Sequence, residues 1–375
     1  MEPLMDERYS IENTSQVLSP GLVVFSDILT ENLEQMIEIA GDPRRLRPHC
    51  KTHKMARVVQ MQLSRGITKH KCATFAEAEM LALAGVKDIL LAYNLVGPNI
   101  ARAVQFVQKY SDVTFIVTAD HAIPIAALGQ AMVESKQRIQ VMLDLDTGQH
   151  RTGVCDAQEA HQLYGAIAET AGLIAGGLHV YDGQNHQTPL VERRSAVNAC
   201  WDQARKLRDA LVGDGYEVPR IVAGGTGSFP IYAAQEDATI ELSPGTCVFQ
   251  DVGYGEHFPD LTFTPAALIL TRVISRPTDN RVTFDLGYKA VASDPPAGSR
   301  LVFPAIPDAR EVLQNEEHLV IETSQAANFL PGDEELAIPR HICPTSALHK
   351  EAWMVAEGKV VERWTVDARD RRLSI

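Results

Sequence analysis

The sequence predicts an α/β protein built on a (β/α)8 barrel of the TIM type, followed by a second, mostly β domain. Two observations predict the barrel. Eight short β-rich runs occur between about residue 30 and about residue 250, and amphipathic stretches of helical length alternate with them. An open doubly wound sheet is the alternative for such an alternation, and the count of eight strands favours the barrel. After Phe249 the helical stretches give way to short alternating segments, which predicts the β domain.

The eight strands of the barrel are predicted from runs rich in β-branched and other apolar residues. In chain order they are Arg45 to Cys50, Thr68 to Ala73, Asp88 to Tyr93, Val113 to Thr118, Ile139 to Asp146, Leu173 to Tyr181, Arg220 to Gly224 and Ala238 to Leu242. Five helices are predicted between these strands: Ala76 to Ala84, Pro98 to Lys109, Ile123 to Ser135, Ala157 to Thr170 and Val191 to Val212. In such a barrel the chemistry lies on the loops that follow the strands.

The C-terminal part is punctuated by prolines and contains short predicted strands. These are Ala267 to Ser275, Arg281 to Asp285, Leu301 to Phe303, His318 to Glu322 and Glu351 to Val355. We therefore expect the barrel over 28–250, and a mostly β domain formed by 1–27 together with 251–375.

Composition restricts the partners. The chain of 375 residues carries a net charge of -13, which argues against nucleic-acid and anionic-membrane partners because both require a basic surface. No apolar run approaches the roughly 20 residues that a membrane helix needs, and the N-terminus does not read as a secretory signal. The six cysteines lack paired spacing, which fits reduced thiols and a cytoplasmic location. A small-molecule substrate is the partner that these observations leave.

The segment from Arg47 to Lys54, with the sequence RPHCKTHK, places an amine, two imidazoles and a guanidinium where the first strand leaves the barrel. A lysine in this position can form a Schiff base with a carbonyl cofactor, and neighbouring cations favour its neutral, nucleophilic form. An exposed basic turn is the alternative interpretation.

Two loops can bind a phosphate group. The first, GGTGS from Gly224 to Ser228, follows an apolar strand, and the second, SPGT from Ser243 to Thr246, follows the next strand. Glycines allow backbone N–H groups to converge on an anion, and hydroxyl groups add donors. TIM barrels often bind phosphate after strands seven and eight, although a glycine cluster alone can also be a tight turn.

A histidine and a cysteine lie two residues apart near the C-terminus, at His341 and Cys343. On an extended strand, side chains at i and i+2 point to the same side, so both can bind one ion. Imidazole and thiolate together suit zinc, whereas a buried core histidine and cysteine are the alternative.

These motifs resemble the D-threonine aldolase and D-serine dehydratase family, which are pyridoxal-phosphate enzymes on an alanine-racemase-like barrel. The segment from Arg47 to Lys54 matches its signature R-P-H-x-K-[ST]-H-K, in which the first lysine holds the cofactor, and this points to Lys51. The segment from Asp146 to Val154 matches D-x-G-x-x-R-x-G-V, whose arginine, here Arg151, lies by the ring oxygen of the cofactor. An arginine paired with Asp146 in a turn is compatible with this role.

The resemblance covers nearly the whole chain and implies further site residues. His49 and Tyr181 are candidate cofactor contacts, and Lys51, Tyr181 and His186 are the candidate catalytic residues. In this family the N-terminal strand, here Gly21 to Phe25, joins the β domain, and an H-x-D or H-x-C pair binds a divalent ion, here Zn, Mn or Mg at His341 and Cys343. The implied phosphate ligands are Thr226, Gly227, Ser228, Gly245 and Thr246.

One position departs from the family pattern. The aldolases carry a tyrosine, a glycine two residues later and a histidine six residues after the tyrosine, whereas the histidine after Tyr181, His186, comes at plus five. His186 is therefore a candidate general base whose placement depends on the loop.

The implied function is a metal-assisted lyase for D-configured β-hydroxy amino acids, with retro-aldol cleavage of D-threonine-like substrates to glycine and an aldehyde. The alternative is dehydration of D-serine or 3-hydroxyaspartate to a keto acid and ammonia. A non-catalytic cofactor carrier is disfavoured by the β domain, and a racemase by the lack of a recognisable second-base motif. Related barrels complete their sites from a partner, so the resemblance also implies a homodimer.

Overall fold

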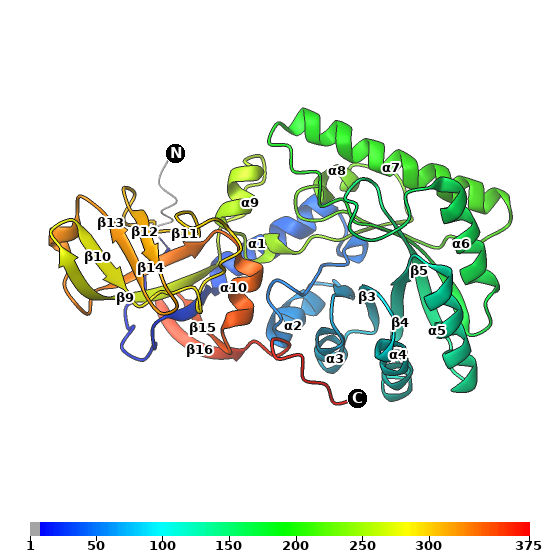
Figure 1. The fold of residues 1–375 in the computed structure, drawn as a ribbon, viewed down its shortest axis with the longest axis horizontal. Coiled ribbons are helices and arrows are strands. Elements are labelled where there is room, and N and C mark those ends of the chain that lie inside the picture. Colours follow the sequence, from blue (N-terminus) through cyan, green and yellow to red (C-terminus); the bar gives the residue numbers. More distant parts are fainter. Residues whose placement is uncertain (1–7) are drawn as a thin grey trace. The chain divides into compact units, whose positions relative to one another are not determined.

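The computed structural model describes residues 8–375, which divide into two compact units (Figure 1). The barrel unit comprises Ile37–Lys51, Ala56–Gly245 and Asp370–Ile375. The β unit comprises the described residues from Arg8 to Met36, together with Thr52–Met55 and Thr246–Arg369. None of the helices within residues 8–375 combines the length and the apolar character required to cross a bilayer.

The barrel unit contains seven named parallel strands, hydrogen-bonded in chain order from β2 to β8. They are β2 (Lys69–Cys72), β3 (Asp88–Asn94), β4 (Thr114–Ala119), β5 (Ile139–Leu145), β6 (Leu173–Val180), β7 (Ile221–Ala223) and β8 (Ile240–Leu242). Its helices are α2 (Ala56–Ser64), α3 (Phe75–Leu83), α4 (Pro98–Lys109), α5 (Ala122–Glu134), α6 (Ala157–Glu169), α7 (Leu190–Gly213) and α8 (Phe229–Ala233). Strand and helix therefore alternate as the sequence predicts, and α2 and α8 are additions to the prediction.

The strand predicted from Arg45 to Cys50 does not form as a regular strand, but this segment meets the sheet through isolated bridges. Leu46 forms a parallel bridge with Leu242 of β8, and His49 forms one with Lys71 of β2. The Arg47 N–H donates to the Leu242 carbonyl at 2.7 Å. This segment joins the first and last strands of the sheet, which confirms the barrel-type α/β fold that the sequence predicts.

Side chains inside the barrel form an apolar layer. Leu90, Ile116, Met142 and Val222 come from four different strands and are fully buried against one another. Inward-pointing branched side chains of this kind fill a TIM-type barrel, so that its interior is a packed core.

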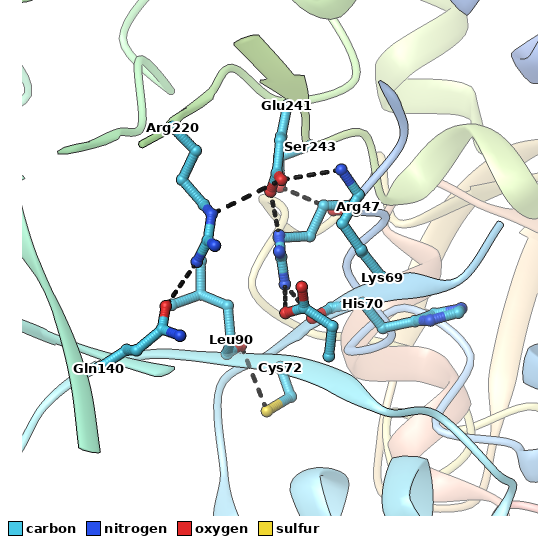
Figure 2. A network of polar contacts seen from close by, with 10 residues as sticks. Arg47, Lys69, His70, Cys72, Leu90, Gln140, Arg220, Glu241 and Ser243 are labelled. Carbon is cyan, nitrogen blue, oxygen red and sulfur yellow. Dashed lines mark hydrogen bonds and ion pairs between the residues drawn. The ribbon is translucent and has the colours of Figure 1, made fainter. Parts of the chain in front are cut away.

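A buried polar network fixes the segment that contains Arg47 to the neighbouring strands (Figure 2). The fully buried Arg47 guanidinium donates to Glu241 Oε2 at 2.5 Å and to Asp88 Oδ1 at 2.8 Å. Lys69 Nζ lies 2.8 Å from Glu241 Oε1, and Arg220 lies 3.8 Å from the same oxygen. Because Asp88 lies on β3, Glu241 lies on β8 and Arg47 lies on the bridging segment between the ends of the sheet, their ion pairs hold the closure of the barrel.

We expect Glu241→Gln to destabilise the protein strongly. The change removes a carboxylate on which three cations converge, and breaking a buried ion pair by removing one partner costs about 3–5 kcal/mol. Equilibrium unfolding by urea checks this value. A loss below 1 kcal/mol, comparable to the ~0–1 kcal/mol of a surface pair such as Lys87 with Asp112, would contradict a role in closure.

The β unit is built on a nine-stranded sheet. Its strands are β1 (Gly21–Phe25), β9 (Ala267–Thr278), β10 (Arg281–Phe284), β11 (Leu301–Val302), β12 (Arg310–Gln314), β13 (Leu319–Glu322), β14 (Glu334–Pro339), β15 (Glu351–Ala356) and β16 (Lys359–Thr365). Strand β1 pairs with β9 antiparallel and with β15 parallel, so the N-terminal strand joins the β unit as the resemblance implies. The remaining helices are α1 (Ser26–Ala40), α9 (Val252–His257) and α10 (Ile342–Leu348).

The expectation that His341 and Cys343 lie on an extended strand is wrong. Strand β14 ends at Pro339, and His341 is the N-cap residue of α10 with extended backbone angles (φ -134°, ψ 99°). Cys343 is in the first turn of that helix, where the following Pro344 is tolerated because N–H groups of the first turn need no helical acceptor. The two side chains are therefore brought together by a strand-to-helix turn.

Candidate active site

A cavity of about 520 Å³ lies in the barrel unit, lined by side chains from the carboxyl ends of successive strands. This is the end at which barrel enzymes carry their chemistry, as the sequence analysis expects. The polar residues in its wall include His49, Lys51, Lys71, Asn94, Thr118, Asp144, Arg151, Thr152, His179 and Tyr181. Four of the candidates from the sequence, His49, Lys51, Arg151 and Tyr181, are thus brought into one cavity.

Three cations surround the ring of Tyr181. Lys51 Nζ lies 5.8 Å from the ring centroid, Lys71 Nζ lies 5.7 Å from it, and Arg151 Cζ lies 4.9 Å from it. The electron-rich face of the ring attracts cations at such distances and allows them to share a small volume. The cavity is therefore suited to an anionic ligand that reaches Lys51.

Lys71 is a functional candidate that the sequence analysis missed. It lies on β2 and is only 3% exposed. Burial, followed by the charge of Lys51, lowers the pKa of its ammonium group to about 7, while Asp144 opposes the change. The signal was present in the sequence, because Lys69 and Lys71 alternate with His70 in a strand whose inward positions should be apolar.

A buried carboxylate and imidazole line the cavity behind these cations. Asp144 Oδ1 lies 2.7 Å from His179 Nδ1, and Asp144 Oδ2 accepts from the Thr152 hydroxyl at 2.8 Å. Burial lowers the pKa of His179, so its neutral ring donates the Nδ1 hydrogen to the carboxylate. Its Nε2 atom is buried and has no hydrogen-bond partner among residues 8–375. The imidazole thus presents an unused acceptor to the cavity.

The loop that carries Arg151 is fixed by Asp146. The Asp146 carboxylate accepts from the Gly148 and His150 N–H groups at 2.9 and 3.0 Å, and it lies 2.9 Å from His150 Nδ1. Asp146 therefore holds the backbone of the turn and His150, while the guanidinium of Arg151 contacts Tyr181.

The two predicted phosphate loops are joined within the barrel unit. The Gly245 N–H donates to the Thr226 hydroxyl at 3.1 Å, and the Ser228 hydroxyl donates to Asp182 at 2.7 Å while accepting from the Gly225 N–H at 3.0 Å. Gly224 has a φ of +80°, and a Cβ there would lie 2.9 Å from a ring carbon of Tyr232. The first loop therefore requires glycine at this position.

His186, the candidate general base, is exposed and is not among the residues that line this cavity. The turn before it is fixed by Asn185, whose N–H donates to the Asp182 carbonyl and whose amide group donates to the Asp182 carboxylate. His186 therefore follows a turn that is held by hydrogen bonds between Asn185 and Asp182.

His49, Cys50 and Glu77 form a second buried cluster, with potential ligand atoms within 4.8 Å of one another. His49 Nδ1 accepts from the Lys51 N–H at 3.2 Å, and Glu77 Oε2 accepts from the Ala73 N–H at 2.6 Å. These bonds hold the backbone on either side of the cavity. We therefore interpret the cluster as structural, because it fixes the segment that carries Lys51.

In the β unit, His341 and Cys343 face each other at the start of α10. His341 Nδ1 lies 2.5 Å from Asp294 Oδ2. Burial opposes the change, but the hydrogen bond and charge of Cys343, followed by those of Asp294, raise the pKa of His341 to about 9. The Cys343 sulfur lies 3.1 Å from the Thr52 hydroxyl and 3.5 Å from that of Thr246, a predicted phosphate ligand.

Asp294 was missed by the sequence analysis, because it lies 47 residues from His341 in an irregular segment. Metal-binding histidines usually donate their second ring nitrogen to a carboxylate, which fixes the ring orientation. Asp251 supports the same turn: it accepts from the Ile342 N–H at 3.0 Å and from the Tyr254 N–H at 2.8 Å. The donor set of imidazole and thiolate with a carboxylate behind it suits a zinc-type ion.

Comparison with known proteins identifies two family models along the chain. Residues 25–251 match the N-terminal domain of alanine racemase, and residues 266–355 match a putative serine dehydratase domain. The first match spans the barrel unit, and the second spans most of the C-terminal strands.

Curated relatives align over most of their length. The chain is 31% identical to a D-threonine aldolase of Arthrobacter sp. over 332 residues, covering 86% of this chain and 85% of the relative. It is 28% identical to a 3-hydroxy-D-aspartate aldolase of Paracoccus denitrificans, covering 98% and 95%. It is 26% identical to a D-threo-3-hydroxyaspartate dehydratase of Delftia sp., covering 92% and 96%.

Among solved structures, the D-threonine aldolase from Filomicrobium marinum is similar, with a TM-score of 0.87 and 27% identity over 95% of this chain and 96% of that one. The chain belongs to the D-threonine aldolase and D-serine dehydratase family, whose barrel is alanine-racemase-like.

Proposed function

We propose that this protein is a metal-assisted, pyridoxal-phosphate-dependent lyase that cleaves D-configured β-hydroxy amino acids, D-threonine-like substrates first, to glycine and an aldehyde. The observation that carries this proposal is the cavity in which Lys51, Arg151 and Tyr181 meet at the carboxyl ends of the barrel strands. Two relatives that align over most of the chain bear the names of D-configured aldolases, which supports the retro-aldol reaction and the D preference.

The residues present fit pyridoxal phosphate, which membership of the family implies. His179 Nε2 is a buried acceptor that, among residues 8–375, lacks a donor, and the cations of the cavity would balance the negative charge of the cofactor. When bound, the cofactor would supply a conjugated ring that accepts the electron pair left on the α-carbon.

The candidate residues of the cavity and of the phosphate loops have the following roles in this proposal. Lys51 would hold the cofactor, and Arg151 would lie by its ring oxygen. Tyr181 and His49 would contact it from the cavity wall, where both lie. The phosphate would be bound by Thr226, Gly227, Ser228, Gly245 and Thr246. His186 and Tyr181 remain the proposed groups for proton transfer at the β-hydroxyl.

The metal would be held by His341 and Cys343. The position of Asp294 behind the imidazole supports this assignment, because it is the arrangement that orients a metal-binding histidine. Two protein ligands leave coordination positions for water and for the β-hydroxyl of a substrate, and a bound cation would favour loss of the hydroxyl proton. Zinc, manganese and magnesium are the candidate ions. A homodimer and a cytoplasmic location remain part of the proposal.

The test is to incubate the protein, supplied with pyridoxal phosphate and a divalent metal, with D-threonine, L-threonine, D-serine and 3-hydroxyaspartate. Glycine, aldehyde and ammonia are then assayed separately. We expect glycine and acetaldehyde in equal amounts from D-threonine and neither from L-threonine. Ammonia without aldehyde would establish the dehydratase alternative, the activity named for the Delftia relative.

A further inference from the structure

The barrel unit brings two lysine amines into one cavity, and the cofactor needs only one of them. The backbone of Lys71 pairs with the segment before Lys51: the Lys71 N–H donates to the Pro48 carbonyl, and the Cys50 N–H donates to the Lys71 carbonyl, both at 2.9 Å. Both side chains end at nearly the same distance from the centroid of the Tyr181 ring.

We propose that the amine of Lys71 is a catalytic residue that transfers the proton at the substrate's α-carbon. The inference rests on the proposed function and extends it. When an amino acid binds through a Schiff-base cofactor, its nitrogen takes the position that the lysine nitrogen leaves, so the α-carbon lies one bond from that position. Because Lys51 and Lys71 both end over the ring of Tyr181, the amine of Lys71 would lie close to the α-carbon.

The surroundings of Lys71 suit proton transfer near neutral pH. Burial is the main cause of its lowered pKa, which brings its amine and ammonium forms to similar populations at about pH 7. Several charged and titratable groups face Lys71 from the surrounding elements. They are Lys51 and Arg47 from the segment that bridges β8 and β2, Asp144 from β5, His179 from β6, and Tyr181 and Asp182 from the segment after β6. Lys51 and Arg47 lower its pKa, and Asp144 and Asp182 raise it.

Other groups in the cavity are less suited to this task. Arg151 carries a guanidinium group, which offers hydrogen-bond donors and no acceptor. The Nδ1–H group of His179 donates a hydrogen bond to Asp144, and the lowered pKa of the ring makes Nε2 a weak base.

The proton balance is complete without a further reactant. During cleavage, the electron pair of the broken bond stays on the α-carbon and takes a proton from the Lys71 ammonium group. The resulting amine regains a proton through solvent, which receives the one that the β-hydroxyl releases. In the reverse sense, the neutral amine removes an α-proton from glycine and becomes an ammonium group.

The test uses glycine as the probe. The protein loaded with pyridoxal phosphate is incubated with glycine in deuterated water, and loss of the α-proton signal is followed by NMR between pH 6 and pH 9. We expect the wild-type rate to rise as the amine deprotonates near pH 7. Lys71→Met should retain the cofactor absorbance, but its rate of α-proton exchange should fall by at least about 10²-fold. General acid–base catalysis contributes about 10²- to 10⁴-fold. Lys71→Arg should remain slow, since a guanidinium keeps its proton.

Lys87→Met is the matched control, because this exposed lysine forms a surface pair with Asp112. The proposal would be overturned if Lys71→Met exchanged the α-proton of glycine at the wild-type rate, or if Lys71→Arg restored that rate. D-threonine cleavage by the wild-type protein is measured in parallel. Its absence would reject the proposed function, whereas cleavage with unchanged exchange in Lys71→Met would reject only the role of Lys71.

A second measurement needs no cofactor. The pKa of Lys71 is lower in the folded than in the unfolded chain, so the folded protein binds fewer protons between about pH 7 and about pH 10. Relative to Lys71→Met, the wild-type folding equilibrium should strengthen by up to about tenfold per pH unit as the pH rises through this window. An equilibrium difference that stays constant from pH 7 to pH 9 would show that Lys71 remains protonated, and it would also overturn the proposal.

Discussion

Lys51→Ala should abolish the visible absorbance of the covalently bound cofactor and lower turnover by at least about 10³-fold, because the covalent attachment that positions the cofactor is lost. Lys51 lines the cavity on the segment that closes the barrel, and its ammonium group lies over Tyr181. Absorbance spectra of the protein loaded with pyridoxal phosphate, together with an aldehyde assay, measure both effects.

The presence of Lys71 in the same cavity sharpens this experiment. Borohydride reduction of the loaded wild-type protein, followed by peptide mass spectrometry, should place the cofactor mass on the peptide that contains Lys51. A label on the Lys71 peptide would contradict the assignment. Lys87→Ala, at an exposed position just before β3, is the control and should leave absorbance and turnover unchanged.

Cys343→Ala should keep the cofactor absorbance while turnover falls by about 10²-fold or more. Loss of the thiolate removes one of two proposed metal ligands, and a metal ion contributes several kcal/mol to transition-state stabilisation, where 1.36 kcal/mol corresponds to a factor of ten. The change lies in the β unit, at the start of α10, whereas the proposed cofactor residues that line the cavity belong to the barrel unit. Metal content by mass spectrometry and aldehyde release measure the effect.

Asp294→Asn provides a graded comparison. It keeps both ligands but weakens the partner of His341, so metal affinity should fall by only about 10- to 100-fold, and added metal should restore turnover. Treatment of the wild-type protein with a chelator should likewise stop cleavage until metal is returned. Full activity in a metal-free sample would end the proposal of a Lewis-acid role.

Patterns that lie within a short stretch of chain could be read from the sequence. The alternation of β-rich runs with amphipathic stretches predicts the barrel because strand and helix periodicities are local properties. The RPHCKTHK segment and the GGTGS loop predict cofactor chemistry because their residue types suffice to suggest it. The helix from Pro98 to Lys109 was predicted with its observed bounds.

Contacts between distant segments could not be read in this way. Asp294 contacts His341 across 47 residues, and Asp144 contacts His179 across 35, although no local pattern links either pair. The turn into α10 was mistaken for a strand, since Pro344 suggests a break rather than the first turn of a helix.

The sequence by itself therefore determined the architecture and the family, and it predicts Lys51 as the cofactor lysine, because these follow from local periodicity and from motifs of adjacent residues. Only the tertiary structure decided the electrostatics of the cavity. In the sequence Lys71 stands out only as a charged residue within a predicted strand, and its pKa near 7 exists only because folding buries it beside Lys51. Desolvation and charge coupling depend on distances in space between residues, and the amino-acid sequence does not specify these distances directly.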